Sequence, residues 1–185
     1  STHLQIAGLM AIAAVDASDW GEVFAGFQER TGLFPDAAYD LPSVTNPRLA
    51  GGMHWTGEAY LAFLRGLAHG DLLSTSSREA LFADQRGDAA VVASPIWEMI
   101  AEDWSYGLGN WLECPDATSP ESFDCGAGHR NSSPGAYGAY PFIDFDEGYF
   151  GIVARQGELQ SGAEGVAIFR TVEDLAAEWS AISCD

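Results

Sequence analysis

The hydrophobic pattern of this sequence changes near residue 90, and this change constrains the fold more than any other feature. Before it, apolar residues recur every three or four positions, as on one face of an α-helix; after it come short strand-like segments with internal glycines. This order excludes a chain of alternating parallel βαβ units and predicts an α+β fold, an antiparallel sheet flanked by helices. We expect helices over residues 4–15, 18–32, 56–70, 76–85 and 171–182, and strands over 106–113, 135–143 and 149–155.

Several of these expected elements carry signals at their ends. Ser18 and Gly32 are typical of a helix N-cap and of the residue after a helix. Residues 76–79 form a Ser–x–x–Glu capping box, and residues 171–174 cap the last helix. Residues 144–148 make the turn of a hairpin. The last helix should present one apolar face, made of Leu175, Ala176, Trp179 and Ile182.

The charge of the chain excludes several kinds of partner. Its 185 residues, enough for one domain or for a fragment of a larger one, carry 27 acidic and 8 cationic side chains and a net charge of −19. Such a charge opposes binding to nucleic acid or to an anionic membrane, and no apolar run reaches the roughly 18 residues of a membrane span. All eight cations are Arg. Without Lys, the chain cannot itself form a Schiff base or a Ser–Lys catalytic pair.

Two of the three cysteines flank a turn-rich loop. Cys114 and Cys125 lie 11 positions apart, which predicts a loop-closing disulfide and an oxidising, secreted or periplasmic location; two free thiols are the alternative. Cys184 is either free or paired with a cysteine outside this chain. Because neither Cys–x–x–Cys nor His–x–x–x–His occurs, we expect no structural zinc, no other metal and no cofactor.

The other metal-ligating or catalytic residue types are scattered or sit in turns. Asp144, Asp146 and Glu147 cluster at the expected hairpin turn, where turn chemistry explains them and a calcium site is the alternative. The histidines form no metal or triad motif, so surface or core roles are expected for His3, His54, His69 and His129.

One polar stretch runs directly into a glycine-rich strand pattern, over residues 132–141. Gly135 and Gly138 would leave one face of the expected strand bare. A bare strand can pair with an extended substrate, or point a backbone N–H at an oxyanion. The alternative is a strand whose glycines allow a helix to pack closely. The residues alone do not separate these two interpretations.

Three motifs in order resemble the serine β-lactamase-related hydrolases, which include class C β-lactamases, DD-peptidases and related esterases. Residues 46–53, Asn–Pro–Arg–Leu–Ala–Gly–Gly–Met, precede a helix with Tyr60, as in the family's A-G-G segment. Residues 106–109, Tyr–Gly–Leu–Gly, resemble its Y-G-x-G strand, and residues 133–138 stand where it has K/H-T/S-G-x-x-G. The resemblance implies the C-terminal half of a β-lactamase/transpeptidase-like domain.

The resemblance also implies roles for individual residues. The family's Ser–x–x–Lys nucleophile is absent here, so a partner segment would have to supply it, and the chain alone should not catalyse. Ser1 matches a hydrogen-bonding position facing that nucleophile, and Ala136 matches the donor of an oxyanion-hole N–H. Ser133 replaces the family's cation, which favours a small ester or amide over a carboxylate-bearing substrate. The implied substrate-binding residues are Ser132, Ser133, Gly135, Tyr137 and Gly138.

Two other functions remain open from the sequence. The first is a secreted binding or scaffold module that keeps this fold without catalysis. The second is an N-terminal-serine hydrolase, in which the hydroxyl and α-amine of Ser1 act as nucleophile and base.

Overall fold

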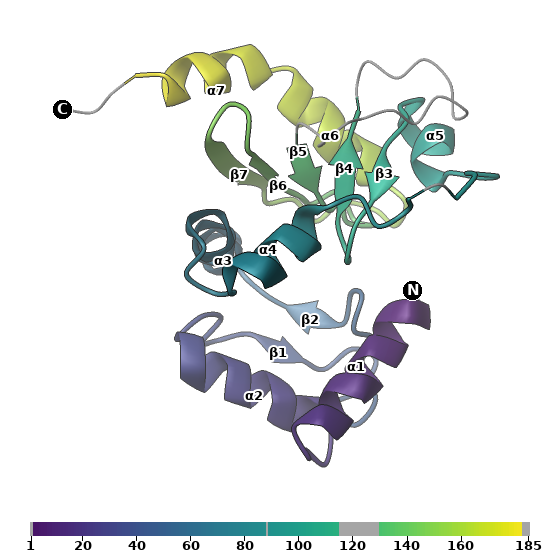
Figure 1. The fold of residues 1–185 in the computed structure, drawn as a ribbon, viewed down its shortest axis with the longest axis vertical. Helices are drawn as coiled ribbons and strands as arrows, with labels where there is room; N and C mark the ends of the chain where they lie inside the picture. Colours follow the sequence, from purple (N-terminus) through teal and green to yellow (C-terminus); the bar gives the residue numbers. More distant parts are fainter. Residues whose placement is uncertain (1, 88, 115–129, 183–185) are drawn as a thin grey trace. The chain divides into compact units, whose positions relative to one another are not determined.

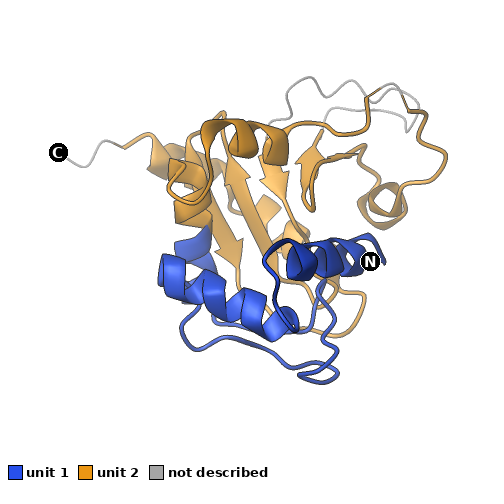
Figure 2. Cartoon of the chain, turned by 60° about the horizontal axis from the view of Figure 1, so that its bottom comes forward, with its two compact units in different colours: residues 1–63 blue, residues 64–185 orange. Residues whose placement is uncertain are grey.

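The computed structural model describes residues 2–87, 89–114 and 130–182. Its internal contacts divide the chain into two compact units, residues 1–63 and 64–185 (Figure 2). The predicted α+β class is confirmed, because helices surround an antiparallel sheet (Figure 1). No helix among the described residues is long and apolar enough to cross a membrane.

Unit 1 is helical, with one small strand pair. It holds α1 (Thr2–Ala14), α2 (Trp20–Thr31), β1 (Ala38–Tyr39), β2 (Met53–His54) and the first half of α3 (Gly57–His69). The sequence predicts a loop over residues 33–52, rich in proline and glycine; the structure instead places β1 within it and β2 directly after it, paired antiparallel. The side chain of Asp19, rather than that of Ser18, accepts the capping hydrogen bond of α2, from the Glu22 N–H. Gly32 ends α2 with a φ of 67°, as predicted.

Aromatic rings hold unit 1 together. Phe34 packs against Tyr60 and Phe63 of α3, with ring centroids 5.9 and 5.5 Å away. Phe24 of α2 meets Tyr39 of β1 edge to face at 5.0 Å. Edge-to-face and tilted pairs of this kind are favourable arrangements of ring quadrupoles. They connect the helices of unit 1 with its strand pair.

Unit 2 contains a five-stranded antiparallel meander, with neighbouring strands in the order β3-β4-β5-β6-β7. The strands are β3 (Ser105–Tyr106), β4 (Trp111–Glu113), β5 (Arg130–Ser132), β6 (Tyr140–Asp144) and β7 (Tyr149–Val153). The helices are the rest of α3 with α4 (Thr75–Phe82), α5 (Pro95–Ile100), α6 (Gly162–Arg170) and α7 (Glu173–Ser180). The hairpin of β6 and β7 is confirmed, with Asp144 opposite Tyr149.

The core of unit 2 lies between β6 and α6. Tyr140 and Phe142, two positions apart on β6, face one way and meet Val166 and Phe169 of α6. The rings of Phe142 and Phe169 lie 4.3 Å apart. This face of β6 is therefore covered by α6.

Several predicted boundaries in unit 2 are wrong. The expected strand 106–113 is a hairpin, because residues 107–110 turn: the Gly107 N–H donates to the Asn110 carbonyl, and Gly109 has a φ of 88°. Ser74, not the expected box at 76–79, caps α4. Helices α5 and α6 were not expected.

The last helix also begins differently from the prediction. The Thr171 hydroxyl donates back to the Ile168 carbonyl of α6, so it does not cap α7. Val172 is the residue before α7, and it makes no side-chain capping hydrogen bond. A hydroxyl that bonds to the preceding turn is unavailable to the following helix, and sequence spacing alone does not distinguish the two uses.

Candidate functional site

The candidate site is the turn that follows β5, where the sequence placed most of its functional residues. The Ser133 N–H donates to the Pro141 carbonyl at 3.0 Å, and the Gly135 N–H donates to the Ala139 carbonyl at 2.7 Å. The Gly138 N–H then closes a β-turn onto the Gly135 carbonyl at 2.9 Å. The predicted strand 135–143 is therefore wrong at its start. Its first residues form the turn, and β5 lies inside residues 114–134, which the sequence predicts to be a loop.

The turn is held in place by the segment that precedes α6. The Ala136 carbonyl accepts hydrogen bonds from the N–H groups of Gln160 and Ser161, at 2.7 and 3.1 Å. The Tyr137 carbonyl accepts one from the Gly157 N–H at 2.7 Å. With both carbonyls engaged, the peptide planes of the turn are fixed.

The backbone N–H groups of Ala136 and Tyr137, the two central residues of the turn, are donors that this arrangement leaves available. Ala136 is exposed, and no acceptor among the described residues takes a hydrogen bond from its N–H. Its neighbour Tyr137 is 49% exposed. A fixed, solvent-facing N–H is the type of group that stabilises a developing oxyanion.

Close packing explains Gly138. Its φ is 88°, and a Cβ there would collide with the Arg155 guanidinium and press on the Ser161 carbonyl. A Cβ on Gly165 of α6 would in turn collide with the Gly138 carbonyl. Gly135 shows no such crowding, because a Cβ there would make only ordinary contacts with Ala139. Of the two interpretations left open by the sequence, helix packing therefore accounts for Gly138.

Ser132 and Ser133 have different surroundings although they are adjacent. Ser132 is 3% exposed and sits on β5, and its buried hydroxyl has no hydrogen-bond partner among the described residues. Burial raises the pKa of Glu113 on the neighbouring β4 above its usual value, against the opposing hydrogen bond from Tyr140 and the charges of two arginines. Ser133 is half-buried at the base of the turn.

A buried charge network, which the sequence did not predict, lies in the same sheet. Arg130 of β5 is 1% exposed and donates to Asp144 from Nε at 3.1 Å and from Nη2 at 2.8 Å. Its Nη2 also donates to Glu173 of α7 at 2.6 Å. The guanidinium lies 4.9 Å from the ring centre of Phe169, a cation–π contact. Arg130 therefore ties the sheet to the C-terminal helices.

Arg170 of α6 extends this network. It donates from Nη2 to Glu113 at 2.8 Å and from Nη1 to Glu173 at 2.9 Å. The only sequence signal for the network was the acidic cluster at residues 144–147. There the predicted turn chemistry is confirmed, since Asp144 Oδ1 accepts from the N–H groups of Asp146 and Glu147. No group of His, Cys, Asp and Glu side chains within the described ranges could hold a metal ion.

Two predicted site residues, Ser1 and Cys125, lie outside the described residues. Cys114 is buried directly after β4. Its pairing with Cys125 stays a prediction, as does the role of Ser1.

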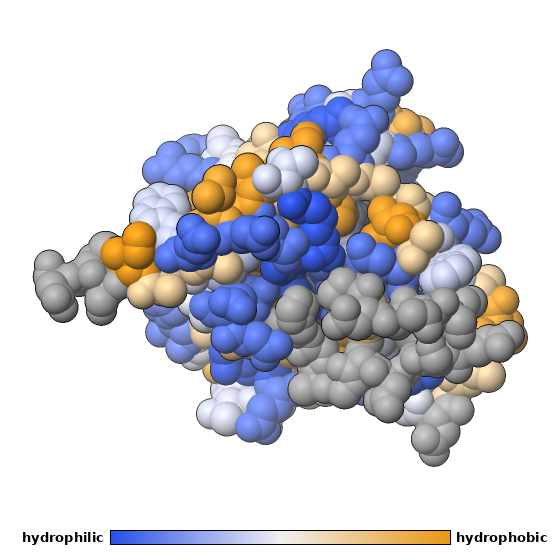
Figure 3. Space-filling view, turned by 90° about the horizontal axis from the view of Figure 1, so that it is seen from above, coloured by the Kyte–Doolittle hydropathy of each residue, from blue (hydrophilic) through white to orange (hydrophobic). Residues whose placement is uncertain are grey.

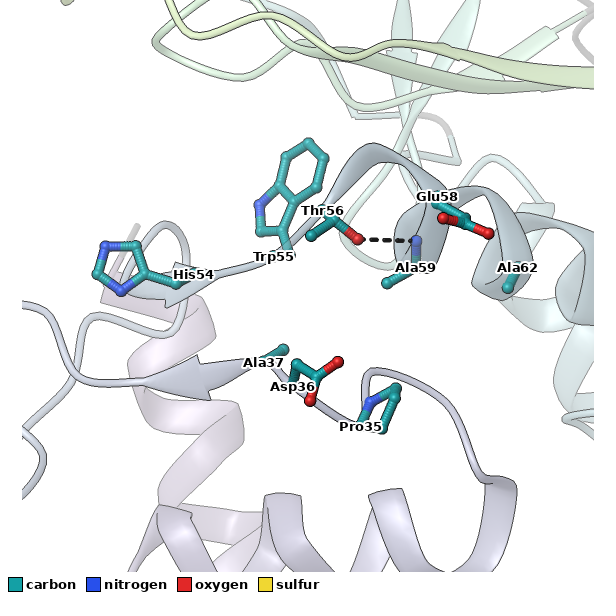
Figure 4. A pocket seen from close by; sticks show the side chains of 9 residues that line it. All are labelled: Pro35, Asp36, Ala37, His54, Trp55, Thr56, Glu58, Ala59 and Ala62. Carbon is teal, nitrogen blue, oxygen red and sulfur yellow. Dashed lines mark hydrogen bonds between the residues drawn. The ribbon is translucent and has the colours of Figure 1, made fainter.

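Unit 1 contains a pocket of about 460 Å³ that the sequence did not predict (Figure 4). It opens between the 35–37 loop and the start of α3, where the Thr56 hydroxyl accepts a hydrogen bond from the Ala59 N–H at 3.2 Å. Its volume falls within the range of small-molecule sites. The lining residues are Pro35, Asp36, Ala37, His54, Trp55, Thr56, Glu58, Ala59 and Ala62.

The comparisons with known proteins concern the fold. No family model matches the sequence, and no curated protein matches it. Among the solved structures, a "putative beta-lactamase" from Bacteroides dorei DSM 17855 matches 92% of this chain with a TM-score of 0.71 and 24% identity. This chain spans 55% of the length of that protein. The chain therefore has a β-lactamase-like fold, which does not by itself determine an activity.

Proposed function

We propose that this chain forms the oxyanion-binding side of the active site in a serine hydrolase that acts on an ester or an amide. The observation that carries the proposal is the Ala136 N–H, exposed and without an acceptor among the described residues, in a turn whose carbonyls are fixed from behind. The β-lactamase-like fold supports a hydrolase. The order of motifs at residues 46–53, 106–109 and 133–138 supports the same assignment.

The reaction requires a nucleophile from another segment, which we expect to carry Ser–x–x–Lys. Its serine oxygen attacks the substrate carbonyl while a nearby base takes the hydroxyl proton, which then passes to the leaving alcohol or amine. The Ala136 N–H and the N–H of that serine hold the oxyanion. Water then adds to the acyl-enzyme and releases the acid. Ser1 would hydrogen-bond on the nucleophile's side, and Gly135 leaves the base of the turn bare.

The charge of the chain favours a neutral substrate. Ser133 stands where a cation would bind a substrate carboxylate, and the net charge of −19 repels anions. Of the other residues that the resemblance implied for substrate binding, Ser132 and Gly138 are buried, so they can shape the turn but offer no contact surface. Tyr137 offers an accessible contact, because it is exposed.

Ala136→Pro tests the oxyanion role, because it deletes the N–H and leaves the side chain small. Ala136 is the second residue of a β-turn, the position at which proline is most readily accepted, so the turn should survive. In the assembly with the Ser–x–x–Lys segment, hydrolysis of a p-nitrophenyl ester should fall by about 10²–10³-fold in kcat. Leu159→Ala, at a 63% exposed side chain in the segment that precedes α6, is the matched control. A folded Ala136→Pro assembly as fast as the parent would overturn the assignment.

The partner segment and the secreted or periplasmic location are part of the same proposal. Native purification from the source, followed by intact mass with and without denaturant, should reveal a second polypeptide or a longer chain. A fluorophosphonate probe should label the serine of its Ser–x–x–Lys motif.

A non-catalytic binding module is the second candidate function, and the pocket of unit 1 favours it. Trp55 offers an aromatic surface there, and Asp36 and Glu58 offer carboxylates. Two results together would favour binding over hydrolysis. Fluorophosphonate would label nothing in the native assembly, and small ligands would change the tryptophan fluorescence of the parent but not that of Trp55→Phe.

A further inference from the structure

An exposed row of apolar side chains follows the two C-terminal helices, and none of these residues belongs to the proposed oxyanion site. The row, called here the apolar stripe, consists of Ile168, Val172, Leu175, Trp179 and Ile182. Their exposed fractions are 46%, 46%, 64%, 76% and 63%. Figure 3 shows hydrophobic patches interrupting a hydrophilic surface on the side of the molecule where α7 lies.

The spacing of the stripe is that of a helix-packing face. Successive members are four, three, four and three positions apart. Within α7, Leu175 and Trp179 are four apart and so lie on one face of the helix, while Val172 and Ile182 flank its two ends at the same spacing. The backbone is interrupted only briefly, since α6 ends at Arg170 and α7 begins at Glu173. Single exposed apolar residues are normal on a protein surface, whereas a continuous patch marks an interaction site.

The opposite face of these helices packs against the sheet. Phe169 of α6 is 5% exposed within the core, and Ala176 of α7 packs against the same cluster. Glu173 receives the hydrogen bond of the buried Arg130. The prediction that Ala176 shares a face with Leu175 and Trp179 is therefore wrong, because α7 packs the partly buried Ala176 against the core and exposes the other two.

The charges beside the stripe indicate what would bind there. Asp174 and Glu178 are exposed next to Leu175 and Trp179, and residues 171–182 contain no cation. A second copy of the chain would bring the same acidic border and another net charge of −19. An anionic membrane is repelled for the same reason.

We propose that the apolar stripe binds an amphipathic helix of a partner polypeptide whose own apolar face is bordered by Lys or Arg. The partner's apolar side chains would pack between Leu175, Trp179 and Ile182. Its cations would lie beside Asp174 and Glu178, which selects against acidic helices. The inference does not depend on the proposed hydrolase activity, because α7 and the stripe carry it alone.

Two synthetic peptides test the proposal directly. Each is a fluorescein-labelled 21-residue helix with Leu at the a and d positions of three heptads; one has Lys at e and g, and the other has Glu. Fluorescence anisotropy with the full chain should show the Lys peptide binding at least tenfold more tightly than the Glu peptide. The difference should shrink as salt is raised, because surface charges are screened. Equal affinity for both peptides, or no binding of either, overturns the proposal.

Variants distinguish binding at the apolar stripe from non-specific hydrophobic binding. Trp179→Ala, at a side chain already 76% exposed, should weaken the Lys peptide at least tenfold and leave the fold intact. The double variant Asp174→Lys/Glu178→Lys should reverse the peptide preference. Val92→Ala, at a residue 97% exposed elsewhere, is the matched control and should change nothing. Unchanged binding by Trp179→Ala overturns the proposal. So does concentration-dependent self-association that this variant abolishes, since it would assign the stripe to a second copy.

Discussion

The two units of this chain bury their interiors to very different degrees. Among the described residues of unit 1, Phe34 is the only large apolar side chain that is fully buried. Unit 2 buries a cluster of six apolar side chains around β6 and α6, and it also buries a charge network. Unit 1 thus depends on contacts between half-exposed rings, and unit 2 depends on a closed core.

The difference shows that a sheet covered by helices can hold a buried charge. Arg130 remains ionised in the interior of unit 2 because carboxylates and ring faces replace its water. Unit 1 has no comparable enclosure among its described residues, and the contact between His54 Nδ1 and Asp40, at 2.8 Å, lies on the surface. Exposed pairs of this kind contribute little to stability. The comparison leads to four predictions, which we order by the size of the expected effect.

Removing Arg130 should have the largest effect. Arg130→Met leaves the carboxylate of Asp144 buried without its main partner and removes a longer ion pair with Glu113, which should cost about 3–5 kcal/mol in urea unfolding followed by circular dichroism. Arg30→Met, at an exposed arginine of unit 1, should stay within about 0.5 kcal/mol. A loss below about 1 kcal/mol for Arg130→Met would contradict the view that unit 2 depends on its buried network.

Phe34→Ala should affect unit 1 alone. Truncating its one fully buried large side chain should cost about 3 kcal/mol, near the low end for phenylalanine because its half-exposed neighbours can close around the gap. Hydrogen exchange should quicken in α2 and in the start of α3, and stay slow in β6 and β7. Leu61→Ala, at a residue 40% exposed on α3, is the control. Equal quickening in both units would mean that they unfold as one.

The predicted disulfide should stabilise unit 2 and leave unit 1 unchanged, because every cysteine follows residue 63. Reduction should lower the stability of unit 2 by about 3 kcal/mol, the chain-entropy value for a short loop. Thiol titration in denaturant without reductant should find only one free thiol. Three free thiols would remove both the Cys114–Cys125 bridge and the proposed oxidising location.

The smallest effects should be two opposite pH dependences within the network of unit 2. Burial raises the pKa of Glu113 above 4.5, so the native state holds this proton more tightly than the unfolded chain. The parent should therefore lose stability relative to Glu113→Gln as pH rises above about 4.5. Burial also opposes ionisation of Glu173, but hydrogen bonds from Arg170 and Arg130 prevail and lower its pKa.

The stabilising effect of Glu173 should consequently be present above pH 4.5 and fade as the pH falls below it. Urea unfolding of the parent, Glu113→Gln and Glu173→Gln between pH 3 and 8 checks both signs. Parallel curves for the parent and Glu113→Gln would show that this carboxyl has the same proton affinity in the folded and unfolded states.

The candidate site could be predicted in part. The run at residues 132–138 marked the position at which an unpaired N–H is found, and Ala136 was singled out within it. The sequence did not reveal that this run begins on a strand and ends in a turn. The turn closes because the Ala136 and Tyr137 carbonyls bond to Gln160 and Gly157, about twenty residues further along the chain. A local sequence pattern cannot identify hydrogen-bond partners that lie so far along the chain.

The sequence by itself determined those features that depend on close neighbours. The change from helices to antiparallel strands, the end of α2 at Gly32 and the turn after Asp144 follow from side-chain spacing, glycine's tolerance of positive φ and local hydrogen bonds. Only the tertiary structure decided that Arg130 is buried and that α7 turns Ala176 inward and Trp179 outward. Burial depends on which distant elements pack together: Arg130 meets Glu173 across 43 positions, a distance that no local pattern spans.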